Sequence, residues 1–142
     1  AHDTHHPIGG GLYYEDQKPE SQRRSRQFIA ERVPKFLNYF EDVLAQNGHD
    51  SWLVGKRCSY ADLSLFQVVA GLRYAFPRAL ERIVRKVPHV MSLSVRVAAR
   101  PRLAAYLMSP RRIPFNEDGI FRHYPELDEQ PTRPRTAKKK KR

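Results

Sequence analysis

The sequence predicts an all-α fold, a helical bundle, from three observations. Apolar residues recur at spacings of three and four along most of the chain, as they do on one face of a helix. Prolines, glycines and a capping motif divide this pattern into separate helices. No segment shows the alternation of apolar and polar residues that is typical of a strand. The 142 residues suit one domain with a short appendage, which we place at 1–128 and 129–142.

A glycine-rich break precedes a long helix. The triplet Gly9-Gly10-Gly11 disfavours helix, so we expect residues 1–17 to hold the end of a helix and then a loop. The long helix should begin at Pro19, which suits a first turn, and stop at Asn47-Gly48. Pro34 should kink it, because proline has no backbone N–H. We interpret its apolar stripe as ordinary core: Phe28, Ile29, Val33, Phe36, Leu37, Phe40, Val43 and Leu44.

A capping box opens the next helix, after an apolar loop over residues 50–58. In Ser59-Tyr60-Ala61-Asp62 the Ser59 hydroxyl can accept from the Asp62 N–H, while the Asp62 carboxylate accepts from the Ser59 N–H. This spacing favours a structural cap over a reactive serine–acid pair. Cys58 and Leu63 occupy the positions of a hydrophobic staple, so we expect Cys58 to be a small buried hydrophobe. The predicted shared face of this helix is Leu63, Phe66, Val69, Ala70 and Arg73.

Three shorter helices follow, over about 77–87, from Pro88, and from Pro101 to near Ser109. From Arg111 to Asp128 we expect an irregular segment. Its expected aromatic anchors are Phe115, Phe121, His123 and Tyr124. The last residues are mainly Pro, Thr, Arg and Lys, which cannot pack a core, so 129–142 should be a disordered basic tail.

The formal net charge of +11 is typical of partners such as nucleic acid or anionic membranes. Residues 129–142 carry +6 of this charge. The run Lys138–Arg142 could act as a nuclear localisation patch or as a phosphate-binding arm. This run has no folded element that could recognise bases, so it would bind nucleic acid without sequence preference. The simpler interpretation is a tail that increases solubility or is an artefact.

Other classes of protein are excluded by simple counts. No apolar stretch approaches the roughly 18 residues that a membrane span needs. Cys58 is the single cysteine, which excludes an internal disulfide and fits a reducing, cytoplasmic compartment. His2, His5 and His6 raise a metal hypothesis, but no cysteine or second cluster completes a four-ligand set. We therefore expect a solvent-facing helix end at these histidines and no metal.

Three motifs resemble one family. Cys58-Ser59-Tyr60-Ala61-Asp62-Leu63 resembles the capping box and staple that open the buried central helix of the glutathione transferase C-terminal domain. Ala99–Pro110 is similar to the late "ARP…YL.SP" helix of that domain, and Trp52-Leu53-Val54-Gly55 resembles its "FLVG" loop. The resemblance covers about residues 1–128, and among classes it is nearest to the pi and sigma group. It implies a bundle of the glutathione transferase C-terminal type with its first helix truncated.

In that family an N-terminal thioredoxin-like domain binds glutathione and supplies the Tyr, Ser or Cys that activates the thiol. The chain shows no βαβ pattern for such a domain. The resemblance therefore implies the co-substrate side of an enzyme that conjugates glutathione to electrophilic small molecules, with no catalytic residue and no activity alone. It implies glutathione as co-substrate without a further cofactor, a homodimer, and no membrane.

The resemblance also implies the residues of the site. Tyr13, Tyr14, Phe115 and Phe121 are the implied contacts for the electrophilic co-substrate. Asp3 lies near the position where relatives carry an acid that reaches glutathione across the dimer. The family's domain interface would be exposed, which predicts self-association. The alternative hypothesis for the function is a non-catalytic helical interaction module. The weakest hypothesis is a nucleic-acid-binding domain, because it rests on the tail alone.

Overall fold

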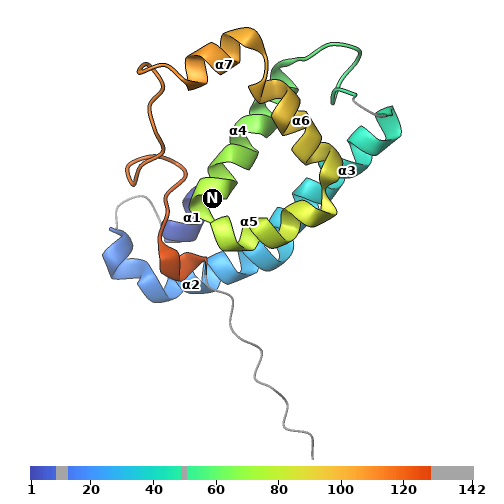
Figure 1. The fold of residues 1–142 in the computed structure, drawn as a ribbon. Helices are drawn as coiled ribbons and strands as arrows, with labels where there is room; N and C mark the ends of the chain where they lie inside the picture. The colour runs from blue at the N-terminus through green and yellow to red at the C-terminus, as the bar shows by residue number, and fades with distance from the viewer. Residues whose placement is uncertain (9–12, 49–50, 129–142) are drawn as a thin grey trace, which may run out of the picture.

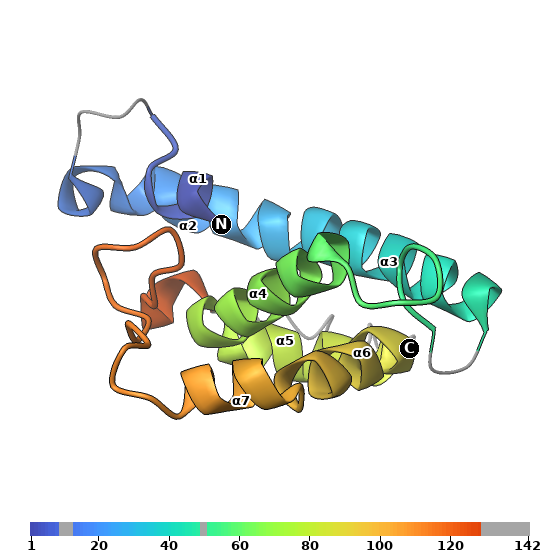
Figure 2. The ribbon, with the colours of Figure 1, turned by 90° about the horizontal axis from the view of Figure 1, so that it is seen from above.

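The computed structural model describes residues 1–8, 13–48 and 51–128. Every regular element among these residues is helical, so the predicted all-α bundle is confirmed. The elements α2, η2 and α3 form one long rod along one side of the molecule (Figures 1 and 2). Helix α4 packs against α5 and α6, and α6 also packs against α3. Helix α7 lies on the side of the bundle away from this rod (Figure 2).

The long rod is not one regular helix. It comprises α2 (Lys18–Gln27), a π-helical turn η2 (Phe28–Arg32) and α3 (Val33–Asn47). A kink was predicted at Pro34, and near it the helix is irregular: the π turn ends two residues before this proline. The Val33 N–H donates to the Phe28 carbonyl, five residues back, and Pro34 has no N–H with which to continue a regular ladder. The rod ends as expected at Gly48, whose φ of +99° suits glycine.

Helix α4 (Tyr60–Ala75) begins with the predicted capping box. Its predicted shared face is correct for Val69 and for Phe66, which packs against the core, and wrong for Leu63 and Arg73. The fully buried side contains Asp62, Leu65, Val69 and Leu72, whereas Leu63 is 43% exposed and Arg73 is exposed. Asp62 turns inward to bind the preceding loop, so Leu63, the next residue, points away from the core. Cys58, which was predicted to be buried, is half-buried and packs against the core. Leu63, the other residue of the predicted staple, is exposed.

The other predicted helices are present. They are α5 (Pro77–Ile83) with the short turn η3 (Val84–Lys86), then α6 (Pro88–Ala98) and α7 (Pro101–Leu107). Helix α7 has no fully buried residue. The short elements are α1 (His2–His5), η1 (Tyr14–Gln17) and η4 (Pro125–Leu127).

The core lies where α3, α4, α5 and α6 meet. Its deeply buried apolar side chains include Leu37, Leu44, Val69, Leu80, Val87, Val90, Leu93 and Val97. Trp52 and Leu53 of the predicted apolar loop do pack onto this core. In the described part of the chain, no helix is long and apolar enough to cross a membrane. The expectations for Gly9-Gly10-Gly11 and for the tail 129–142 fall outside the described residues.

Candidate functional site

The C-terminal segment, residues 111–128, runs back from the end of α7 to the N-terminal elements (Figure 1). His5 Nε2 lies 3.2 Å from the Ile120 carbonyl oxygen, and His123 Nδ1 lies 3.2 Å from that of Ala75. The Ser25 hydroxyl donates to the carbonyl of Leu127, which is buried. The segment that carries Phe115 and Phe121 is therefore fixed to the bundle at several points.

Phe115 and Phe121 lie close together but face two different hollows. Their ring centroids are 6.0 Å apart with nearly perpendicular planes. The Phe115 ring stacks on Tyr74, with centroids 5.2 Å apart. Phe121 covers α4 at Gly71, where an added Cβ would be only 2.4 Å from the Phe121 ring. Glycine is thus required at residue 71 for this ring to lie against the helix.

The first hollow, the α3/α4 hollow, has a volume of 320 Å³. It is lined by Ala1, Phe28, Arg32, Val33, Phe36, Leu37, Phe40, Leu65, Val68, Leu72, Ile120 and Phe121. The second, the α4/α7 hollow, has a volume of 250 Å³. It is lined by Leu63, Phe66, Gln67, Leu103, Tyr106, Leu107, Arg112, Ile113 and Phe115.

Of the two hollows, the α3/α4 hollow is the one suited to apolar ligands rather than to acid–base chemistry. Each has one charged side chain in its lining, Arg32 in the α3/α4 hollow and Arg112 in the α4/α7 hollow. The first is within the range of about 300–1,000 Å³ that is usual for small-molecule sites. Four phenylalanines line it, so it can hold a flat apolar molecule by contact and stacking. Neither lining contains a carboxylate, histidine or cysteine that could activate a thiol.

The structure separates the two predicted tyrosines. Tyr13 is 80% exposed, whereas Tyr14 is 6% exposed and stacks on Tyr124, with ring centroids 3.8 Å apart. The Tyr14 hydroxyl donates to Glu126 Oε1 over 2.8 Å. Burial, and then this bond to the Glu126 carboxylate, raise the pKa of Tyr14 well above its usual value. Tyr14 thus joins η1 to the C-terminal segment, and neither tyrosine lines the two hollows. Their contact with a co-substrate stays a prediction.

Asp3 lies on the exposed side of α1. Its carboxylate is 3.2 Å from His2 Nδ1, and this hydrogen bond lowers the pKa of Asp3. Asp3 lines a polar hollow of 160 Å³ that also includes Arg24 and Glu31. This hollow shares Ala1, Phe28 and Arg32 with the α3/α4 hollow, so the two are neighbours.

The histidine cluster differs from its prediction. The expectation of a solvent-facing helix end is wrong for His5, which is 1% exposed. Burial lowers the pKa of His5 to about 4. The His5 and His6 ring centroids are 4.8 Å apart, and that of His2 lies 5.5 Å from that of His5. Among the described residues, no group of three or more His, Cys, Asp or Glu side chains is arranged to hold a metal ion.

Asp62 does more than the capping box predicted. It is fully buried, and its Oδ2 accepts from the Ser59 N–H at 2.7 Å. Its Oδ1 accepts from the Leu53 N–H at 2.9 Å. Asp62 therefore ties the loop before α4 to the helix start. The capping motif gives no sign of this second bond, because it joins residues nine positions apart.

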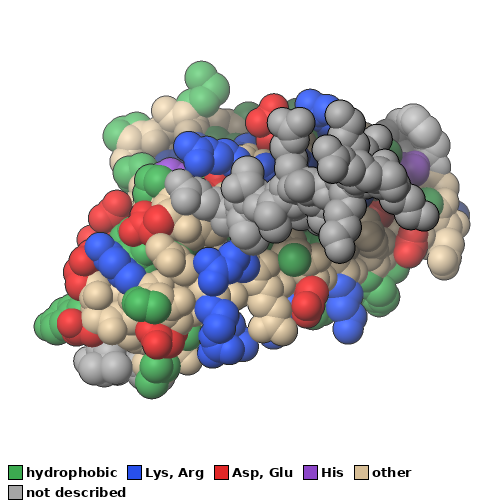
Figure 3. All heavy atoms as spheres, turned by 90° about the horizontal axis from the view of Figure 1, so that it is seen from below, with side chains coloured by type: hydrophobic (Ala, Val, Ile, Leu, Met, Phe, Trp, Pro, Cys, Tyr) green, Lys and Arg blue, Asp and Glu red, His purple; other side chains and the backbone are tan. Residues whose placement is uncertain are grey.

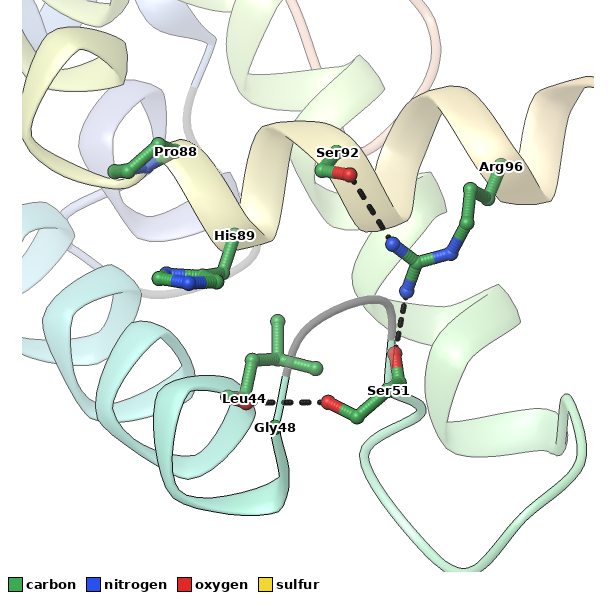
Figure 4. A pocket seen from close by; sticks show the side chains of 7 residues that line it. All are labelled: Leu44, Gly48, Ser51, Pro88, His89, Ser92 and Arg96. Atoms are coloured by element: carbon green, nitrogen blue, oxygen red, sulfur yellow. Dashed lines mark hydrogen bonds between the residues drawn. The ribbon is translucent and has the colours of Figure 1, made fainter.

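A further pocket at the C-terminal end of α3, with several polar groups around it, was not predicted (Figure 4). It has a volume of 220 Å³, and Figure 4 shows His89 and Arg96 beside it on one side of α6. Glu41 accepts from the backbone N–H groups of His89 and Val90, both over 2.9 Å, and contacts His89 Nδ1 at 2.5 Å. Arg96 donates to Ser92 Oγ at 3.1 Å and to the Ser51 carbonyl. These polar groups bind one another, so they connect α3, α6 and the loop.

Comparison with known proteins adds family information to this geometry. Residues 2–110 match the family model for "Glutathione S-transferase, C-terminal domain". The chain is 31% identical over 90 residues to glutathione S-transferase P of Capra hircus and 32% identical over 90 residues to that of Homo sapiens. Each match covers 61% of this chain and 41% of the relative. Glutathione S-transferase alpha I of Oryctolagus cuniculus is 29% identical over 105 residues, 72% of this chain and 45% of the relative. The matches therefore span less than half the length of these curated relatives.

Proposed function

The chain belongs to the glutathione S-transferase family as a C-terminal domain, and on this premise we propose that it forms the co-substrate side of a glutathione transferase. The enzyme would conjugate glutathione to electrophilic small molecules in the cytoplasm, in a detoxifying role. The observation that supports this best is the α3/α4 hollow, with Phe121 on one side and the aromatic residues of the rod on the other. Such a surface can hold an apolar electrophile by contact alone.

The thiol-activating group would come from a separate glutathione-binding domain. The linings of both hollows lack a carboxylate, a histidine and a cysteine, and we propose that this chain alone does not catalyse conjugation. Asp3, beside the polar hollow next to the α3/α4 hollow, is the proposed contact with glutathione across a homodimer. Exposed aromatic residues on α3, Phe36 at 47% and Tyr39 at 61%, provide apolar surface for self-association.

We propose the α4/α7 hollow as part of the surface that receives this glutathione-binding domain. Leu63 is 43% exposed and Ile113 is 79% exposed beside the half-buried Phe115. Soluble proteins seldom leave adjoining apolar groups open unless another element covers them. The same surface favours the second candidate, a non-catalytic interaction module, because a different protein could cover it equally well.

A chimera tests the enzymatic proposal. The N-terminal domain of human glutathione S-transferase P would be joined to this chain, and conjugation of glutathione to an aromatic halide would be measured. Phe121→Ala is expected to raise the KM for the halide by about ten-fold or more, as the loss of a buried aromatic contact would, and to leave the KM for glutathione unchanged. Tyr60→Ala, which removes an 84% exposed tyrosine outside both hollows and outside the proposed self-association surface, is the matched control. The chain without the added domain should give no conjugation above the buffer rate.

The outcomes separate the two candidates. An active chimera in which Phe121→Ala leaves the halide KM unchanged would remove the α3/α4 hollow as the co-substrate site. A chimera that folds, by circular dichroism, but is not retained on immobilised glutathione would favour the interaction module. Conjugation by the chain alone would contradict the proposed need for a second domain.

A further inference from the structure

His5 is a buried imidazole that lines neither hollow but bonds to one side of the α3/α4 hollow. The face of the molecule in Figure 3 carries acidic and basic side chains at its surface, where water can solvate their charges. His5, in contrast, is 1% exposed. Its Nε2 lies 3.2 Å from the carbonyl oxygen of Ile120, 115 positions along the chain. Ile120 and Phe121 both line the α3/α4 hollow, and we call them its C-terminal wall.

The contacts of the His5 ring define its protonation state. A carbonyl oxygen only accepts hydrogen bonds, so Nε2 carries the proton and donates it to Ile120. Nδ1 of the neutral ring is then an acceptor, and it is buried without a hydrogen-bond partner among the described residues. A second proton, on Nδ1, would therefore place an unpaired N–H and a positive charge inside the protein.

The groups around the ring offer no negative charge to balance that proton. Four titratable or charged side chains, none of them a carboxylate, surround it: His2, His6, Arg122 and Tyr124. The acid of α1, Asp3, has its side chain 74% exposed and bonded to His2 instead. The contact from α2 is the uncharged hydroxyl of Ser21. Burial, aided by the neighbouring cations, accordingly lowers the pKa of His5 to about 4.

Of the two sides of this bond, the C-terminal one has fewer other hydrogen bonds. The His5 carbonyl is tied to α2, because it accepts from the hydroxyl of the fully buried Ser21 at 3.4 Å. Among the described residues, the other hydrogen bonds of 111–122 join positions at most four apart. Loss of the bond from His5 would therefore free the C-terminal wall rather than α1.

We propose that His5 is the positioning residue for Phe121: its neutral ring holds the C-terminal wall of the α3/α4 hollow in place, and protonation of the ring releases that wall. This inference rests on the proposed function, because it concerns the hollow that we propose for the co-substrate. Between pH 6.5 and about 4, each pH unit should shift the ratio of released to held wall by up to about ten-fold toward release.

The test observes residue 121 directly. The full chain would carry 4-fluorophenylalanine in place of Phe121 and be studied by fluorine saturation-transfer NMR, which detects minor states. Near neutral pH the main resonance should differ from that of the urea-unfolded chain, because the ring lies against α4 at Gly71. From pH 6.5 to about 4.5 the ratio of a released state to the main state should rise by up to about 100-fold. Circular dichroism should show that the helices persist.

Two variants of His5 separate the hydrogen bond from the titration. The amide of His5→Gln can donate to the Ile120 carbonyl but does not titrate, so this variant should keep the held state throughout the pH range. His5→Leu cannot donate. It should raise the ratio of released to held wall by about two- to ten-fold at neutral pH, as the net loss of one hydrogen bond would, with little further change on acidification. The matched control is His2→Gln, an exposed histidine of the same helix, which should retain the native pH response.

Three results would overturn the proposal. The first is a native chain whose released fraction does not change with pH. The second is a pH response that survives in His5→Gln. The third is a response that His123→Gln removes while His5→Gln retains it, because the titrating group would then be His123, which lies 3.2 Å from the Ala75 carbonyl oxygen.

A ligand measurement distinguishes this inference from the proposed function. The probe is N-phenyl-1-naphthylamine, a neutral apolar fluorophore. If it occupies the α3/α4 hollow, its apparent Kd should rise in inverse proportion to the fraction of held wall. A Kd that does not change with pH, together with the expected fluorine response, would support the role of His5 and remove the hollow as the apolar binding site. A Kd that rises equally in the native chain and in His5→Gln would contradict the role of His5.

Discussion

Substitution of Asp62 by alanine would remove a fully buried carboxylate at the start of α4. Its oxygens accept hydrogen bonds from the Ser59 N–H at 2.7 Å, the Ser59 hydroxyl at 3.0 Å and the Leu53 N–H at 2.9 Å. Loss of a helix cap costs about 0.5–2 kcal/mol. A buried N–H left without a partner, as at Leu53, costs about 1–3 kcal/mol more. The free energy of unfolding should therefore fall by about 1.5–5 kcal/mol in Asp62→Ala.

Urea titration followed by circular dichroism would measure this change, with two variants for comparison. Ser59→Ala removes the hydroxyl but leaves both bonds between the carboxylate and backbone N–H groups, so it should cost only about 0.5–2 kcal/mol. Asp62→Asn keeps one acceptor oxygen and should fall between the other two.

The fluorescence of Trp52, the single tryptophan, provides a local readout. Trp52 directly precedes Leu53, so release of the Leu53 N–H should change the surroundings of the indole and shift its emission. The same shift should be absent in Ser59→Ala. If Asp62→Ala and Ser59→Ala cost the same and neither alters the emission, the bond between Asp62 and Leu53 contributes nothing, and the reasoning fails.

Three further predictions concern the segments that hold the ends of the chain, and urea titration measures each. Gly71→Ala should lower the free energy of unfolding by about 1–3 kcal/mol through overpacking against Phe121; in a Phe121→Ala background it should instead stabilise by up to about 1 kcal/mol, because alanine favours helix. Asp128→Ala should cost about 1–3 kcal/mol through loss of its bonds to the start of α5, whereas deletion of 129–142 should leave the midpoint unchanged. Because the pKa of His5 is about 4 in the folded chain and 6.5 ordinarily, the unfolded chain binds the extra proton. Stability should therefore fall as pH decreases from 6.5 to 4, by up to about 1.4 kcal/mol per pH unit, and His5→Gln should remove this slope.

Local signals in the sequence were sufficient for the helix starts. Pro77, Pro88 and Pro101 each begin a helix in the structure, as they were predicted to do. The capping box at Ser59 was also correct. Each of these signals works through the few residues next to it, because a proline fixes its own φ and a cap bonds within one turn. Such features can be predicted without knowledge of the tertiary fold.

Bonds between distant residues could not be predicted in this way. Asp128 bonds to N–H groups 49 and 50 residues away, and Tyr14 bonds to Glu126 across 112 residues. Tyr14 was predicted as a co-substrate contact from the resemblance to the glutathione transferase family. Its position against Tyr124 depends on how the C-terminal segment returns to η1, and no local pattern encodes that return. The aromatic anchors of the C-terminal segment were predicted, but the buried Leu127 and Asp128 were not.

The prediction of which residues of α4 are buried was partly wrong because apolar residues are distributed around this helix. Apolar residues surround this helix on nearly all sides, which is typical of a helix that is covered all round. In the structure Leu65, Val69 and Leu72 face the core, while Leu63 is 43% exposed and Val68 is 42% exposed. Leu63 lines the α4/α7 hollow and Val68 the α3/α4 hollow, so the helix is open on two flanks. Covering the exposed part of each side chain would contribute about 0.6–1.3 kcal/mol, in proportion to its exposed fraction. The sequence of α4 is thus better suited to an assembly in which both flanks are covered, and this supports the proposal that the α4/α7 hollow receives a second domain.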